Sequence, residues 1–212
     1  MSEFTLITGG ARSGKSHFAE LLAASAKSSV IYIATAQVWD DEMALRVKKH
    51  QKQRPSTWRL IEEPQAIRDT LFQLKDENGV ILLDCVTLWL SNLLLKGQTK
   101  PASSSEQSPK ESSVGPQENS EQFSDLEPQI VATVREVAQL AREIKPQVIF
   151  VSNEIGQGIV PEYPLARAYR DLVGRCNQIL AQSADAVYLV VAGFPIEIKH
   201  TGEKLLASLR EE

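Results

Sequence analysis

The sequence is poor in the features that mark secreted, membrane and nucleic-acid-binding proteins. Two cysteines among 212 residues, Cys85 and Cys176, make neither a disulfide framework nor a zinc site. No apolar run reaches the roughly 18 residues that a membrane helix needs, and the first residues lack the basic and apolar segments of a signal peptide. A formal net charge of −4 argues against nucleic acid or anionic membranes as partners. These absences predict a protein of the reducing cytoplasm without a membrane anchor.

What the sequence does contain is an alternation of buried strands and helices. Five short apolar runs are typical of strands covered on both faces, at residues 4–8, 30–34, 80–84, 148–152 and 187–191. Helical patterns lie between them, at residues 88–95 and 165–184 and in two sets that each share one face: Phe18, Leu21, Leu22 and Ser25, and Ile130, Val134, Val137 and Ala141. This order predicts one α/β domain over residues 1–212, with a doubly wound, mainly parallel sheet.

One segment does not fit that core. Residues 97–124 hold eight serines and three prolines, and their only aliphatic or aromatic residues are Ala102, Val114 and Phe123. Such a segment buries too little apolar surface to offset its ordering entropy, so we expect a disordered insertion. A phosphorylated or partner-binding segment is the alternative.

The most specific motif lies between the first strand and its helix. It has the form G-x-x-x-x-G-K-[ST] and consists of Gly9, Gly10, Ala11, Arg12, Ser13, Gly14, Lys15 and Ser16. In such a P-loop the backbone N–H groups converge on a phosphate, the lysine reaches the outer phosphates, and the serine hydroxyl binds Mg²⁺. The motif predicts a nucleoside triphosphate site, and the alternative is a glycine turn that binds nothing.

Polar residues follow two further strands. Asp84 ends the third apolar run and is a candidate Mg²⁺ ligand, although it can instead cap the helix that follows. Asn153 and Glu154 end the fourth run, where ligands bind in open α/β sheets, so they are candidates for binding substrate or acting as a base. The alternative is that they only terminate a strand.

A histidine and several arginines lie on predicted helices. Met43, Val47, His50 and Arg54 form one stripe of a helix expected from Asp40 onward, and such a histidine is either a packing residue or a catalytic one. Arg167, Arg170 and Arg175 share a later helix, where they can clamp phosphates or form salt bridges between subunits.

Together these residues identify a family. The sequence resembles the bifunctional adenosylcobinamide kinase / adenosylcobinamide-phosphate guanylyltransferase of cobalamin biosynthesis, which has a recombinase-like P-loop NTPase fold and forms a homotrimer. The resemblance rests on the P-loop and on residues 32–36, 41–50, 54–58, 152–161 and 174–177. The insertion at 97–124 is longer than the family's usual connection.

The resemblance implies two reactions. ATP or GTP, with Mg²⁺, phosphorylates the aminopropanol hydroxyl of adenosylcobinamide, and GTP then transfers GMP to that phosphate through a guanylylated histidine. His50 matches this histidine, with Lys15 as the second catalytic residue. The resemblance also implies nucleotide contacts outside the P-loop, from Ile33, Ala34, Thr35, Ala36, Gln51, Lys52, Gln53, Arg54, Glu62 and Asp84. It implies that Ser16 and Asp84 bind the metal.

Two other classes of protein share the P-loop. One is a kinase of another small metabolite, in which His50 is structural and no covalent nucleotide adduct forms. The other is a regulatory module that binds a nucleotide and changes its partners without turnover.

Overall fold

The computed structural model describes residues 3–37, 55–98 and 118–209. Their strands form one sheet of seven, in the order β3-β2-β4-β5-β1-β6-β7. All neighbours are parallel except β6 and β7, which pair antiparallel. The strands are β1 (Phe4–Gly9), β2 (Val30–Ala34), β3 (Arg59–Glu62), β4 (Val80–Asp84), β5 (Gln147–Val151), β6 (Ala186–Val191) and β7 (Phe194–Glu197).

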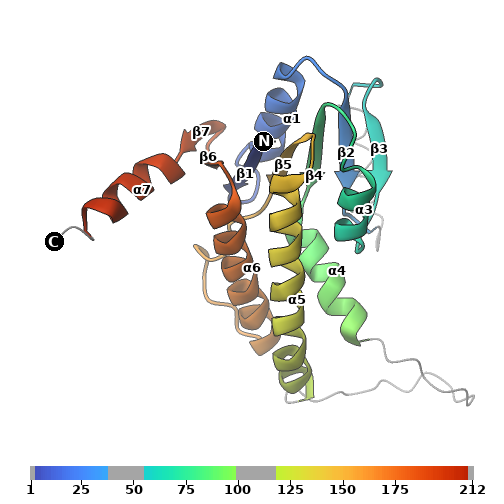
Figure 1. Ribbon diagram of the computed structural model, residues 1–212. Coiled ribbons are helices and arrows are strands. Elements are labelled where there is room, and N and C mark those ends of the chain that lie inside the picture. The colour runs from blue at the N-terminus through green and yellow to red at the C-terminus, as the bar shows by residue number, and fades with distance from the viewer. Residues whose placement is uncertain (1–2, 38–54, 99–117, 210–212) are drawn as a thin grey trace, which may run out of the picture.

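Helices cover both faces of this sheet (Figure 1). One face packs on α1 (Lys15–Ser25), whose Ala19 and Ala23 are buried against it. The other face packs on α3 (Ile67–Gln73), α4 (Val86–Gln98), α5 (Glu118–Glu143) and α6 (Pro164–Ser183). A last helix, α7 (Lys199–Ser208), buries none of its residues and projects from the rest of the molecule (Figure 1). The predicted doubly wound, mainly parallel α/β fold is confirmed.

Burial on both faces explains why the central strands are continuous apolar runs. In β4, Ile81 and Leu83 join the core under α3 to α6, whereas Val80 and Leu82 join the core under α1. All five predicted strands are present within a residue or two of their expected ends. The short strands β3 and β7 were not predicted, because most of their side chains are exposed and their sequences show no apolar run.

Two details differ from the prediction. The face of α1 that meets the sheet is formed by the buried alanines Ala19 and Ala23 with the partly buried Phe18 and Leu22, while Leu21 points to solvent. Helices also take in both ends of the segment 97–124: α4 continues to Gln98, and α5 begins at Glu118 and buries Phe123 in the core. The segment predicted to be disordered was therefore drawn too long at both ends. At its second end, Phe123 has apolar partners on neighbouring helices. Residues 99–117 lie outside the described residues.

Among the helices that the structure describes, none is both long and apolar enough to cross a membrane.

Candidate nucleotide-binding site

The parallel strands bring their carboxyl ends to one edge of the sheet. Ala34 on β2 pairs with both Glu62 on β3 and Asp84 on β4, and Asp84 pairs in turn with Val151 on β5. The chain leaves β1 for α1 on one face and leaves β5 for α6 on the other face. In open α/β sheets such a divergence forms the crevice in which ligands bind, so we expect the ligand at the ends of β1 and β5.

The P-loop lies at the end of β1, in the strand–turn–helix setting that its motif requires. Gly14 has a left-handed φ of 95°, and a Cβ there would lie 3.0 Å from the Gly193 Cα. The Gly193 N–H donates a hydrogen bond of 2.8 Å to the Ser13 carbonyl, so the β6–β7 turn supports the loop. Position 14 therefore requires glycine for two reasons, the left-handed φ and the lack of space for a Cβ.

Lys15 is buried within this loop. Its side chain is 8% exposed, and its Nζ donates a hydrogen bond of 3.0 Å to the Gly10 carbonyl. Burial lowers the pKa of the Lys15 ammonium, and the nearby negative charge of Asp84 acts in the opposite direction. The predicted metal ligand Asp84 and the predicted phosphate ligand Lys15 therefore lie within electrostatic reach of each other.

The P-loop region also contains unpaired polar atoms that fit a phosphate and a metal. Within the described residues, the buried hydroxyls of Thr8 and Ser13 have no hydrogen-bond partner. A buried hydroxyl without a partner is destabilising, so a ligand that supplies one is favoured. The Ser16 hydroxyl and the Asp84 carboxylate offer the hard oxygen donors that Mg²⁺ prefers, and Mg²⁺ commonly uses only one or two carboxylates beside substrate phosphates.

Thr35, at the end of β2, is a supporting residue of this edge. It is fully buried, and its hydroxyl donates to the Cys85 carbonyl at 2.7 Å and accepts from the Cys85 N–H at 2.9 Å. The Asn92 side chain donates to the Thr35 carbonyl at 2.8 Å. These bonds fix the backbone directly after Asp84. Ile33 is also buried, while Ala34 and Ala36 are half-buried.

The remaining nucleotide-contact predictions are spread more widely. Glu62 is exposed at the end of β3, with β2, β4 and β5 between it and β1. His50, Gln51, Lys52, Gln53 and Arg54 lie outside the described residues, as does the helix expected from Asp40 onward.

Asn153 belongs to a hydrogen-bonded network that joins the carboxyl end of β5 to α4 and α6. Its side-chain N–H donates to the Thr87 hydroxyl at 2.6 Å, and its carbonyl accepts from the Asn177 side chain at 3.1 Å. Ser152 donates to Asn177 at 2.6 Å, and the Tyr169 hydroxyl donates to the Thr87 carbonyl at 2.6 Å. Sequence reasoning missed Thr87 and Tyr169, because residues so far apart in the chain leave no local pattern.

Glu154 connects β5 to the P-loop through its backbone. Its N–H donates a hydrogen bond of 3.0 Å to the Gly9 carbonyl, and its carboxylate accepts one of 2.8 Å from the Gly156 N–H. The structure therefore joins the Glu154 backbone to the P-loop, and Asn153 directly precedes it at the same end of β5.

The two cysteines are packing residues rather than nucleophiles. Both are buried, and burial raises the pKa of the Cys85 thiol to about 11 and that of the Cys176 thiol to about 12. The nucleophilic form of cysteine is the thiolate, which is scarce at neutral pH with such pKa values.

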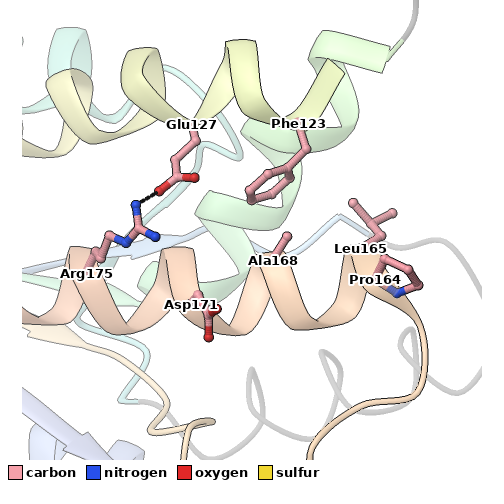
Figure 2. Close-up of a pocket in the computed structure, with 7 residues that line it drawn as sticks. All are labelled: Phe123, Glu127, Pro164, Leu165, Ala168, Asp171 and Arg175. Atoms are coloured by element: carbon pink, nitrogen blue, oxygen red, sulfur yellow. Dashed lines mark hydrogen bonds and ion pairs between the residues drawn. The ribbon is translucent and has the colours of Figure 1, made fainter. Parts of the chain in front are cut away.

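The arginines of α6 interact within the chain. Arg167 donates to the Pro161 and Glu162 carbonyls, and Arg175 forms an ion pair with Glu127 of α5. Arg175 and Glu127 lie in a pocket of about 270 Å³ between α5 and α6 (Figure 2). The other residues lining the pocket are Phe123, Pro164, Leu165, Ala168 and Asp171. None of them belongs to the P-loop, so this pocket is separate from the nucleotide site.

Comparisons with known proteins agree with this geometry. The family described as "Cobinamide kinase / cobinamide phosphate guanyltransferase" matches residues 5–198. The chain is 40% identical over 196 residues to the bifunctional adenosylcobalamin biosynthesis protein CobU of Escherichia coli K12, covering 92% of this chain and 98% of that protein. It is 39% identical over 201 residues to the corresponding CobP of Pseudomonas aeruginosa, with coverage of 94% and 98%.

A solved structure supports the fold alone. A type III secretion system ATPase superposes with a TM-score of 0.52 at 11% sequence identity, covering 96% of this chain and 53% of that one.

Proposed function

Since the chain belongs to the family of cobinamide kinases and cobinamide phosphate guanyltransferases, we propose that it catalyses both reactions on adenosylcobinamide. The first phosphorylates the aminopropanol hydroxyl with ATP or GTP, and the second gives adenosylcobinamide-GDP from GTP. The observation that carries this proposal is the buried Lys15 in a P-loop, within electrostatic reach of Asp84, in a chain that matches the family over residues 5–198.

In the kinase step the P-loop holds the triphosphate while the substrate hydroxyl loses its proton and attacks the γ-phosphorus. The bond from this phosphorus to the β–γ bridging oxygen breaks and releases the nucleoside diphosphate. Lys15 and the backbone N–H groups at the start of α1 stabilise the charge that develops on the phosphoryl oxygens. Mg²⁺, held by Ser16 and Asp84, would neutralise further charge on these phosphates. Asn153 and Glu154, at the crevice beside Gly9, contact the substrate, with Glu154 as the candidate base.

In the guanylyltransferase step His50 is the nucleophile. A neutral imidazole nitrogen attacks the α-phosphorus of GTP, an N–P bond forms, and the bond to the β-phosphate oxygen breaks to release pyrophosphate. A phosphate oxygen of adenosylcobinamide phosphate then attacks the same phosphorus and displaces the imidazole. Further nucleotide contacts come from residues 33–36, 51–54 and Glu62.

The experiment that tests this proposal follows the α-phosphate of GTP. Purified protein is incubated with Mg²⁺ and GTP labelled at that phosphate, and label is sought on the denatured chain. We expect an acid-labile, alkali-stable adduct that disappears in His50→Ala. The matched control is His200→Ala, because His200 is an exposed histidine of α7 that pairs with Glu197, and this variant should label normally.

A wild-type protein that binds GTP and stays unlabelled would contradict the covalent mechanism. Cobinamide phosphorylation without label would then favour a plain kinase, and binding without any transfer would favour a regulatory module.

The proposal extends to a homotrimer in the cytoplasm. An exposed apolar surface on β7 and α7 supports the subunit contact, since Phe194, Ile196, Leu205, Leu206 and Leu209 are more than half exposed. Two buried, unpaired cysteines fit a reducing compartment. Light scattering should give three times the mass of one chain, and a monomeric mass would remove the trimer from the proposal.

A further inference from the structure

The loop between β5 and α6, whose first residues bond to the P-loop, exposes apolar side chains along its course. Ile159 is 97% exposed, Val160 62% and Tyr163 74%. No charged residue lies between Glu154 and Glu162. Adjacent, largely exposed branched aliphatic residues in an uncharged run are expected where a ligand or partner covers them.

Both ends of this loop are fixed by hydrogen bonds. At its start, the Glu154 N–H bonds to the Gly9 carbonyl of the P-loop at 3.0 Å. At its end, the Arg167 guanidinium donates to the Pro161 carbonyl at 3.1 Å and to the Glu162 carbonyl at 2.5 Å. The exposed side chains are therefore presented on an anchored loop that begins at the phosphate site.

We propose that Ile159, Val160 and Tyr163 contact the corrin ring of the substrate. This inference rests on the proposed function and names the surface that recognises the acceptor. A corrinoid has a broad ring whose edge carries methyl groups and amide side arms, and the group that reacts lies at the end of one of these arms. Because the arm must reach the phosphates in the P-loop, the ring lies beside that loop, where an apolar surface lowers its exposure to water.

Two further exposed apolar residues lie on other elements of the fold. Leu21 on α1 and Phe72 on α3 are each 56% exposed, and each is isolated from other exposed apolar side chains on its own helix. They serve instead as matched controls, because replacing them removes a comparable exposed apolar side chain away from the loop.

The test separates the step that needs the corrinoid from the step that does not. Guanylylation of the protein by GTP needs no corrinoid, so I159S/V160S should label at the wild-type rate. The KM for cobinamide phosphate should rise by about tenfold, because contact with apolar surface is lost. Leu21→Ser and Phe72→Ser should leave both quantities unchanged. The milder I159A/V160A should give a smaller rise in KM, and circular dichroism checks that each variant is folded.

An unchanged KM in I159S/V160S would overturn the inference. If the same variant also changed the mass of the assembly, a second copy of the chain would be the occupant of the loop. Failure of the proposed function gives a different result, because wild-type protein would then take no label from GTP at all.

Discussion

The carboxyl edge of β2, β4, β5 and β1 and the C-terminal arm, formed by β7 and α7, use their side chains in opposite ways. At the edge, the polar groups of Thr35, Thr87 and Ser152 are buried and hydrogen-bonded. Their partners are Cys85, Asn153 and Asn177, respectively. On the arm, apolar groups such as Leu205 and Leu209 are exposed, and α7 buries none of its residues. Burial of polar groups fixes geometry, because any displacement leaves them unsatisfied. Exposure of apolar groups instead leaves a surface for another molecule.

The arm is attached mainly by polar contacts at its base. Lys199 at the start of α7 donates to the Ala181 and Gln182 carbonyls at 3.0 Å and to the Ala184 carbonyl, near the end of α6. Glu197 accepts hydrogen bonds from the N–H groups of Lys199 and His200. The arm is thus held at one end, while hydrogen bonds connect the edge across the ends of four strands, β2, β4, β5 and β1, and to the helices α4 and α6.

The largest expected effect comes from Lys15→Met at the edge. Both reactions should slow by about a hundredfold or more, because the charge that stabilises the phosphoryl oxygens is lost. The nucleotide-free protein should nevertheless become more stable to heat. Since burial lowers the pKa of Lys15, the folded state binds the proton less strongly than the unfolded state, and the charged amine reduces stability at every pH below its folded pKa.

The measurements are turnover and the midpoint of thermal unfolding without nucleotide. Lys204→Met is the control on the arm, because Lys204 is exposed, and it should change neither quantity. A Lys15→Met protein with normal turnover would show that the P-loop is not the phosphate site.

A smaller effect is expected from Thr87→Val, which removes the hydroxyl that accepts from Asn153. Thr87 is 5% exposed, so the Asn153 amide loses its partner in a largely buried setting. The variant should lose about 1–3 kcal/mol of unfolding free energy in urea. The kcat should fall, and its fold-change should be larger than the fold-change in the KM for GTP. Thr87→Ser restores a hydroxyl and should recover both. If valine and serine behaved alike, the network would have no part in holding the edge.

Sequence patterns predict the parts of this molecule that are local or buried on both sides. The five central strands and the P-loop belong to this class, since an apolar run or a glycine spacing is visible over a few residues. The Thr87–Asn153 bond joins residues 66 positions apart, and only the fold brings them together. The strand β7 is antiparallel and exposed, so its sequence carries neither an apolar run nor an alternation that marks it.

The smallest effect on the stability of the single chain is expected on the arm, from L205S/L206S/L209S. These leucines are more than half exposed, and α7 buries none of its residues, so the unfolding free energy of the dissociated chain should change by about 0.5 kcal/mol or less. The mass from light scattering should fall, because the substitutions remove the apolar surface proposed to bind another copy. Phe72→Ser, which removes an exposed apolar side chain from α3, should leave the mass unchanged.

If the assembly of the triple variant kept the wild-type mass, the subunit contact would lie elsewhere on the chain. A large loss of stability at a concentration where the variant is monomeric would show that the arm packs on its own chain, and the contrast with the edge would then be one of degree.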